Sequence, residues 1–214
     1  MRTEEMIARL ACGLRPVRRM PSPLVLLALW TLLAAAVIGL AALVFGTRAG
    51  LDRPMTGFET MHSLAALLTA LLAGLAAFEL SLPDRDRRWA WLPLPAIGLW
   101  LGTMGVGCVG ELVRLGAEGI RFHVSWHCLQ FIIGLGLPMA GLMLWLTRHA
   151  AWIRPLPVAG FGALSAAAFA SIGLTLVHPT YGPLMVLAWH GVAVLAVTGL
   201  AALFGPRLAW RVPA

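Results

Sequence analysis

Long apolar runs dominate the chain, and short breaks rich in proline, glycine and charge separate them. Each run is about 20 residues long, which is the length of helix that crosses a bilayer core. We therefore predict an all-α integral membrane protein with six membrane-spanning helices: Leu24–Phe45, Ser63–Leu82, Trp89–Val109, His127–Thr147, Leu156–Val177 and Leu184–Phe204. The fifth run gives the weakest signal because it is rich in glycine, alanine and serine.

Small residues recur every four positions in two of the runs, which places them on one face of a helix. The two stripes are Ala66, Ala70, Gly74 and Gly162, Ala166, Ala170. Small side chains let helix backbones approach closely in lipid, so the stripes predict contacts between helices. An alanine-rich composition also produces such spacings by chance, and this alternative stays open.

The composition supports a membrane protein. Hydrophobic residues make up 60% of the 214 residues and charged residues only 12%, about half the charged share of a soluble domain. Three cysteines without regular spacing exclude a disulfide framework and a zinc site of the CxxC type. The net charge of +7 comes from arginines scattered between apolar runs. This pattern does not favour binding to nucleic acid, which requires a basic patch or helix.

The distribution of arginine predicts the orientation. All 16 basic residues are arginine, and four lie in breaks on one side of the predicted membrane: Arg48, Arg53, Arg114 and Arg121. The other twelve lie on the opposite side, which the positive-inside rule identifies as cytoplasmic. Both termini are then cytoplasmic. We predict a cytoplasmic segment over residues 1–22, a transmembrane domain over 23–205 and a cytoplasmic tail over 206–214.

The first segment has the pattern of a short amphipathic helix. Thr3 is suited to the N-cap, Glu4 and Glu5 match the positive end of the helix dipole, and Pro16 ends the helix. One apolar stripe has the spacing i, i+3, i+4 and i+7, and consists of Ile7, Leu10, Ala11 and Leu14. A helix this short is only marginally stable alone, so we expect a surface to complete it.

Two surfaces are available to this helix. It can lie flat on the membrane interface, or it can place its apolar stripe in the groove of a partner protein. The acidic pair Glu4 and Glu5 fits anionic headgroups less well. The residues alone leave both alternatives open.

The order of several motifs resembles a known family. In chain order they are TEEMIARLA, RPVRRMPSP, Cys128-Leu129, Leu137-Pro138 and Trp189-His190-Gly191. Together with six spans, they resemble the NrsF-type membrane anti-sigma factors over nearly the whole chain. The resemblance implies a non-enzymatic protein of the bacterial inner membrane that holds an extracytoplasmic-function sigma factor through its N-terminal segment. The expected sigma-binding residues are Glu4, Glu5, Ile7, Leu10 and Leu14.

The resemblance also implies release of the sigma factor on periplasmic metal or oxidative stress. The family relies on two periplasmic cysteines, and Cys128 matches the first. The second belongs in the loop before the sixth span, but residues 178–183 read HPTYGP and contain no cysteine. His178 is the substitute that we expect, with an imidazole in place of the second thiolate.

Other residues on the predicted periplasmic side extend this sensor. We expect Cys128 and His178 to be aided by His127, His190 or Cys108. Thiolate and imidazole ligands suit copper or zinc, bound as the signal. A disulfide between Cys108 and Cys128 is an alternative if their Cα atoms approach within about 7 Å. Each histidine also has a purely structural interpretation, and Cys108 has a packing one.

Two other classes of protein remain as alternatives. A small metal or solute transporter needs polar residues lining the middle of the membrane, and the runs contain few. A haem or quinone oxidoreductase needs histidines paired across two spans, and His190 is the one histidine well inside a predicted span.

Overall fold

The computed structural model describes residues 3–12, 20–46, 57–116, 126–150, 153–177 and 183–209. The regular elements in these ranges are all helical. They are α1 (Thr3–Cys12), α2 (Pro23–Phe45), α3 (Gly57–Ser81), the short 3-10 helix η1 (Arg87–Trp91), α4 (Leu94–Leu115), α5 (Trp126–Leu146), α6 (Pro155–Val177) and α7 (Pro183–Ala209).

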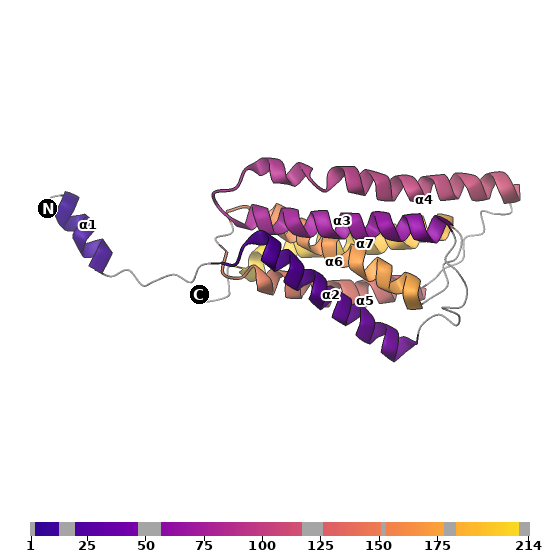
Figure 1. Ribbon diagram of the computed structural model, residues 1–214, viewed down its shortest axis with the longest axis horizontal. Helices are drawn as coiled ribbons and strands as arrows, with labels where there is room; N and C mark the ends of the chain where they lie inside the picture. Colours follow the sequence, from indigo (N-terminus) through magenta and orange to yellow (C-terminus); the bar gives the residue numbers. More distant parts are fainter. Residues whose placement is uncertain are drawn as a thin grey trace.

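Helices α2 to α7 form one antiparallel bundle, and α1 stands apart from it (Figure 1). The chain reverses at each connection, so the bundle has two ends. We call the end where α2, α4 and α6 begin the Pro23 end, and the end where α3, α5 and α7 begin the Phe45 end. Helix α1 lies beyond the Pro23 end (Figure 1).

Five helical segments are long and apolar enough to cross a membrane: Pro23–Phe45, Gly57–Ser81, Arg87–Arg114, Leu129–Leu146 and Pro155–Val177. The first five predicted spans correspond to them. The sixth predicted span lies in α7, whose apolar part within the described residues is the shorter stretch Gly191–Phe204. The structure therefore supports a multi-pass membrane protein with an all-helical fold.

The centre of the bundle is α6, whose run is rich in glycine, alanine and serine. In its most apolar window 67% of the residues are buried, against 28% for α2. Helices α3 and α6 share the largest contact among the described elements, and both predicted stripes of small residues are buried in them. The prediction of close helix packing is confirmed. A central helix faces other helices instead of lipid, so it carries small side chains in place of large apolar ones.

Two predicted boundaries were wrong, and a third predicted span begins with a different type of helix than expected. Helix α3 begins at Gly57 instead of Ser63, because two polar side chains in its first turns are buried against the bundle. Helix α4 continues past Val109 to Leu115 and ends at Gly116, whose positive φ of 61° suits a glycine at a helix end. The residues before α4, expected to start a span at Trp89, form η1, which Asp86 caps through the Arg88 N–H at 2.9 Å.

Candidate functional site

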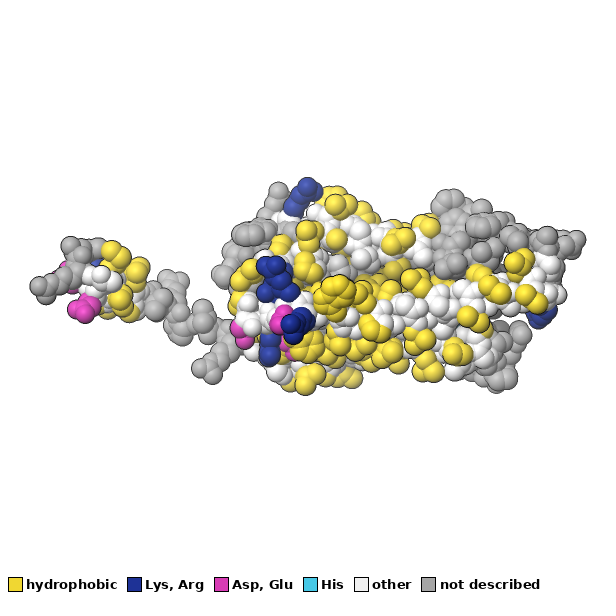
Figure 2. Space-filling view, turned by 90° about the horizontal axis from the view of Figure 1, so that it is seen from above, with side chains coloured by type: hydrophobic (Ala, Val, Ile, Leu, Met, Phe, Trp, Pro, Cys, Tyr) yellow, Lys and Arg dark blue, Asp and Glu magenta, His cyan; other side chains and the backbone are white. Residues whose placement is uncertain are grey.

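Helix α1 presents exposed apolar side chains to its surroundings. Every residue of α1 is exposed, and the relative solvent exposure is 60% for Ile7 and 67% for Leu10. Met6, which the sequence analysis did not single out, lies one turn before Leu10 and extends the stripe. Figure 2 shows yellow hydrophobic side chains gathered on one side of α1. A stripe that no described part of the bundle covers is suited to a groove on another molecule.

The acidic residues of α1 lie where they were expected. Glu4 and Glu5 are exposed in the first turn, near the positive end of the helix dipole. The helix ends at Cys12, and the predicted contact residue Leu14 lies outside the described residues. The described part of the predicted sigma-binding segment is thus a separate amphipathic helix.

Four of the predicted sensor residues belong to helices that meet at the Phe45 end. His127 and Cys128 are in the first turn of α5, and His190 is in α7, about 10 Å along the helix from Pro183 at 1.5 Å per residue. The side chains of these three residues lie outside the described part of the structure, and His178 lies outside the described ranges altogether. The order of the helices therefore brings these elements to the same end of the bundle. That the ligand atoms lie close enough together to share a metal ion stays a prediction.

Cys108 is the one predicted sensor residue whose side chain is described. It is partly buried on α4, about 10 Å along the helix from Leu115. Among the described residues, no three His, Cys, Asp or Glu side chains come close enough to hold a metal ion. The predicted ligands Cys128 and His178 lie outside the side chains that this statement covers.

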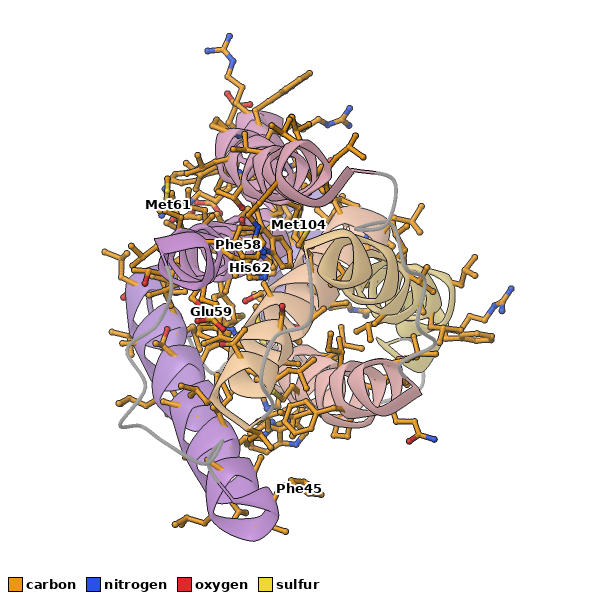
Figure 3. All side chains as sticks on the ribbon, turned by 90° about the vertical axis from the view of Figure 1, so that its right-hand side faces the viewer. Phe45, Phe58, Glu59, Met61, His62 and Met104 are labelled. Atoms are coloured by element: carbon orange, nitrogen blue, oxygen red, sulfur yellow. The ribbon has the colours of Figure 1, made fainter. Side chains whose placement is uncertain are left out.

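The sequence analysis missed a buried polar pair at the same end. His62 is 1% exposed, and its ring lies 5.9 Å from the ring of Phe58 and 5.9 Å from that of Trp100 on α4. Glu59, one turn earlier on α3, is also buried, and Met104 follows Trp100 one turn later on α4 (Figure 3). His62 lies just before the span predicted from Ser63, among polar residues that resemble a loop in the sequence.

The Pro23 end carries most of the described charge. The arginines of the bundle at this end are Arg85, Arg87, Arg88, Arg148, Arg154 and Arg207, and Arg114 is the one described at the Phe45 end. Arg85 pairs with the buried carboxylate of Glu79 at 3.0 Å, and Arg154 donates to the Arg85 carbonyl at 2.8 Å. Figure 2 shows most of the visible dark blue arginines at the end that faces α1.

One comparison with known proteins gave a match. The family model described as NrsF, negative regulator of sigma F, matches residues 10–210. The matched range contains the whole bundle and begins at Leu10, within α1. No curated protein and no solved structure matches the chain.

Proposed function

The chain belongs to the NrsF family of negative regulators of sigma F, and from this membership we propose that it is a membrane anti-sigma factor for an extracytoplasmic-function sigma factor. The role is regulatory and non-enzymatic. The observation that carries the mechanism is α1, an amphipathic helix with an uncovered apolar stripe, attached to an apolar helical bundle.

The proposed capture step uses α1 as a helix in a groove of the sigma factor. Ile7 and Leu10 enter the groove, and Glu4 and Glu5 pair with basic residues of the sigma factor. Leu14 continues the stripe in the chain. Burying an exposed side chain of this size contributes about 1.5–3 kcal/mol, so the stripe supplies several kcal/mol toward capture.

The proposed topology has six spans, with α7 as the sixth and both termini in the cytoplasm of a bacterial cell. The excess of arginine at the Pro23 end supports this orientation. Residues 1–22 then form the sigma-binding segment, 23–205 the sensor domain and 206–214 the tail. This arrangement puts α1 in the compartment that holds RNA polymerase, and the Phe45 end in the periplasm.

The proposed signal is a metal ion or an oxidant that acts at the Phe45 end. Cys128 and His178 are the central ligands, with His127, His190 and Cys108 in support, and copper or zinc is the metal that such ligands suit. A ligand shifts an equilibrium only if it binds one state better than the other. Binding must therefore favour an arrangement of the bundle in which α1 no longer holds the sigma factor.

Affinity purification of the full chain from unstressed cells tests the capture function. We expect a sigma factor to copurify, and a stress treatment to reduce its amount. A tag at residue 1 should be inaccessible to a protease added to the periplasm. Absence of any sigma factor, or periplasmic digestion of the tag, would contradict the proposal.

The sensor assignment is tested with the double variant Cys128→Ser, His178→Ala. We expect it to capture the sigma factor normally and to keep it bound when zinc chloride, copper chloride or hydrogen peroxide is added. His149→Ala is the matched control, because this histidine is exposed at the Pro23 end. Release from the double variant at the wild-type concentration would exclude these residues as the sensor.

A further inference from the structure

Helix α2 is the helix of the bundle that follows α1 along the chain. The described side chains of α1 are all exposed, and α2 is the next helix along the chain. A rearrangement of the bundle that changes how α1 is presented is therefore transmitted along the chain by α2.

The first half of α2 is held by a buried chain of hydrogen bonds. Trp30 is completely buried, and its Nε1–H donates to Ser165 Oγ on α6 at 2.9 Å. The Ser165 hydroxyl donates in turn to the Ala70 carbonyl on α3 at 2.7 Å. The indole also meets the ring of Phe169 edge-on at 6.1 Å. Gly74 leaves room for this arrangement, because a Cβ there would lie 3.1 Å from Ser165 Oγ.

These bonds fix α2 in a way that apolar contacts do not. The other buried positions of α2 are Pro23, Leu26, Ala34, Ile38 and Ala41. Apolar side chains of this kind tolerate small rotations and shifts, whereas a hydrogen bond requires a narrow range of distances and angles. In a water-free interior the polar groups also lack a replacement partner. The hydrogen bond of Trp30 therefore fixes both the rotation of α2 about its axis and the position of α2 along that axis.

The last turn of α2 is held much less than the rest of the helix. Leu43 is 84% exposed, and Val44 and Phe45 are also exposed. At this end the Phe45 ring meets the edge of Phe131 on α5, with ring centres 5.9 Å apart. Phe131 follows Cys128 by one turn of α5. The loosely packed end of α2 thus touches the helix that begins with the proposed sensor.

We propose that Trp30 and Ser165 are positioning residues that form the pivot of α2 in the sigma-holding state. A change at the first turn of α5 then moves the end of α2 through the contact between Phe45 and Phe131. The α2 segment beyond Trp30 is about 22 Å long and the segment before it about 10 Å. A displacement at Phe45 reaches Pro23 at roughly half its size and in the opposite direction. This inference rests on the proposed function.

Transcription from a sigma-dependent promoter in unstressed cells tests the pivot. The test variants are Trp30→Phe, which removes the N–H donor, and Ser165→Ala. The controls are Trp100→Phe, since the buried Trp100 Nε1 has no hydrogen-bond partner among the described residues, and Thr175→Val. Thr175 is buried on the same helix as Ser165, but its hydroxyl donates to the Ile172 carbonyl of its own helix at 2.7 Å.

We expect Trp30→Phe to raise unstressed transcription about two- to tenfold, which is the effect of one lost hydrogen bond on an equilibrium. Ser165→Ala should raise it at least as much, because it also removes the bond to the Ala70 carbonyl. The double variant should exceed Ser165→Ala by little, because Ser165→Ala already removes the bond that Trp30→Phe removes, together with the bond to the Ala70 carbonyl. The controls should match wild type, and all variants should reach the wild-type amount in the membrane. Test variants that behave like the controls, or whose effects multiply, would overturn the pivot.

A second measurement reports the position of the end of α2 and does not require the sigma factor. The photoreactive analogue p-benzoylphenylalanine at position 45 should cross-link to α5 in the full-length protein in membranes. We expect Ser165→Ala to lower the yield and Thr175→Val to leave it unchanged. Equal yields would refute the pivot even if capture is confirmed. If no sigma factor is captured while the yields differ as expected, the proposed function fails and the pivot stands.

Discussion

Leu10→Asp is the most direct test of the capture helix. Leu10 is 67% exposed on α1, in the middle of the apolar stripe. A buried leucine contributes about 1.5–3 kcal/mol relative to an exposed one, and an aspartate in an apolar groove adds a further penalty for burying charge. A loss of at least about 2 kcal/mol corresponds to roughly thirtyfold weaker binding. We expect a dissociation constant raised by this factor or more.

Ala8→Asp is the matched control for this substitution. Ala8 is exposed and lies about 160° around the helix from Leu10, so it carries the same new charge on the opposite face. The new aspartate lies four residues after Glu4, and such like-charge pairs destabilise a helix by about 0.2–0.5 kcal/mol. An aspartate at position 10 also weakens α1, because it lies in the last turn near the negative end of the helix dipole. The two variants therefore destabilise the helix itself by comparable amounts. If only Leu10→Asp raises the dissociation constant strongly, the cause is a lost contact between Leu10 and the sigma factor.

The assay uses the full chain in nanodiscs and the sigma factor that copurifies with it. Fluorescence anisotropy of the labelled sigma factor gives the dissociation constants for wild type and both variants. Circular dichroism checks that the helix content is unchanged. Equal weakening by Ala8→Asp and Leu10→Asp would refute the groove assignment, and so would unchanged binding by Leu10→Asp.

Two further predictions concern stability and are measured by thermal unfolding in detergent. Gly74→Leu should destabilise the bundle by about 1–3 kcal/mol through overpacking, because a Cβ at Gly74 already approaches Ser165 Oγ to 3.1 Å. Gly39→Leu, where nothing lies within 4 Å of the added Cβ, should have little effect, and equal effects would contradict the packing argument. Arg85→Ala should destabilise by about 1–3 kcal/mol, because it strips the buried Glu79 carboxylate of its cation. Glu79→Gln should be milder, because the remaining arginine is partly exposed, and the reverse order would contradict this assignment.

Much of the fold was predictable because lipid imposes a simple pattern on the chain. The first five apolar runs coincide with helices long enough to span a membrane. The start of α3 was not predictable, since Glu59 and His62 read as part of a polar loop. Both are buried in the structure. A polar residue inside a helix is recognised only when the neighbours that cover it are known.

The candidate site was also predictable from the sequence only in part. The amphipathic pattern of α1 predicted an exposed stripe that contains Ile7 and Leu10, and the structure agrees. The choice of Cys128 and His178 rests on side-chain chemistry and on the end of the bundle where their elements meet. Distances between such ligands depend on how separate helices pack, and periodicity along the chain does not encode this packing.

The sequence alone determined the apolar runs, the asymmetric distribution of arginine and the two faces of α1. These features follow from whether each residue meets lipid, water or a partner, which is a local property. Only the tertiary structure decided that α6 is the central helix and that Trp30 meets Ser165, 135 residues away. Such a pairing depends on the shapes of three helices at once, including the space left by Gly74. The residues next to Trp30 and Ser165 in the sequence do not indicate that these two side chains pair.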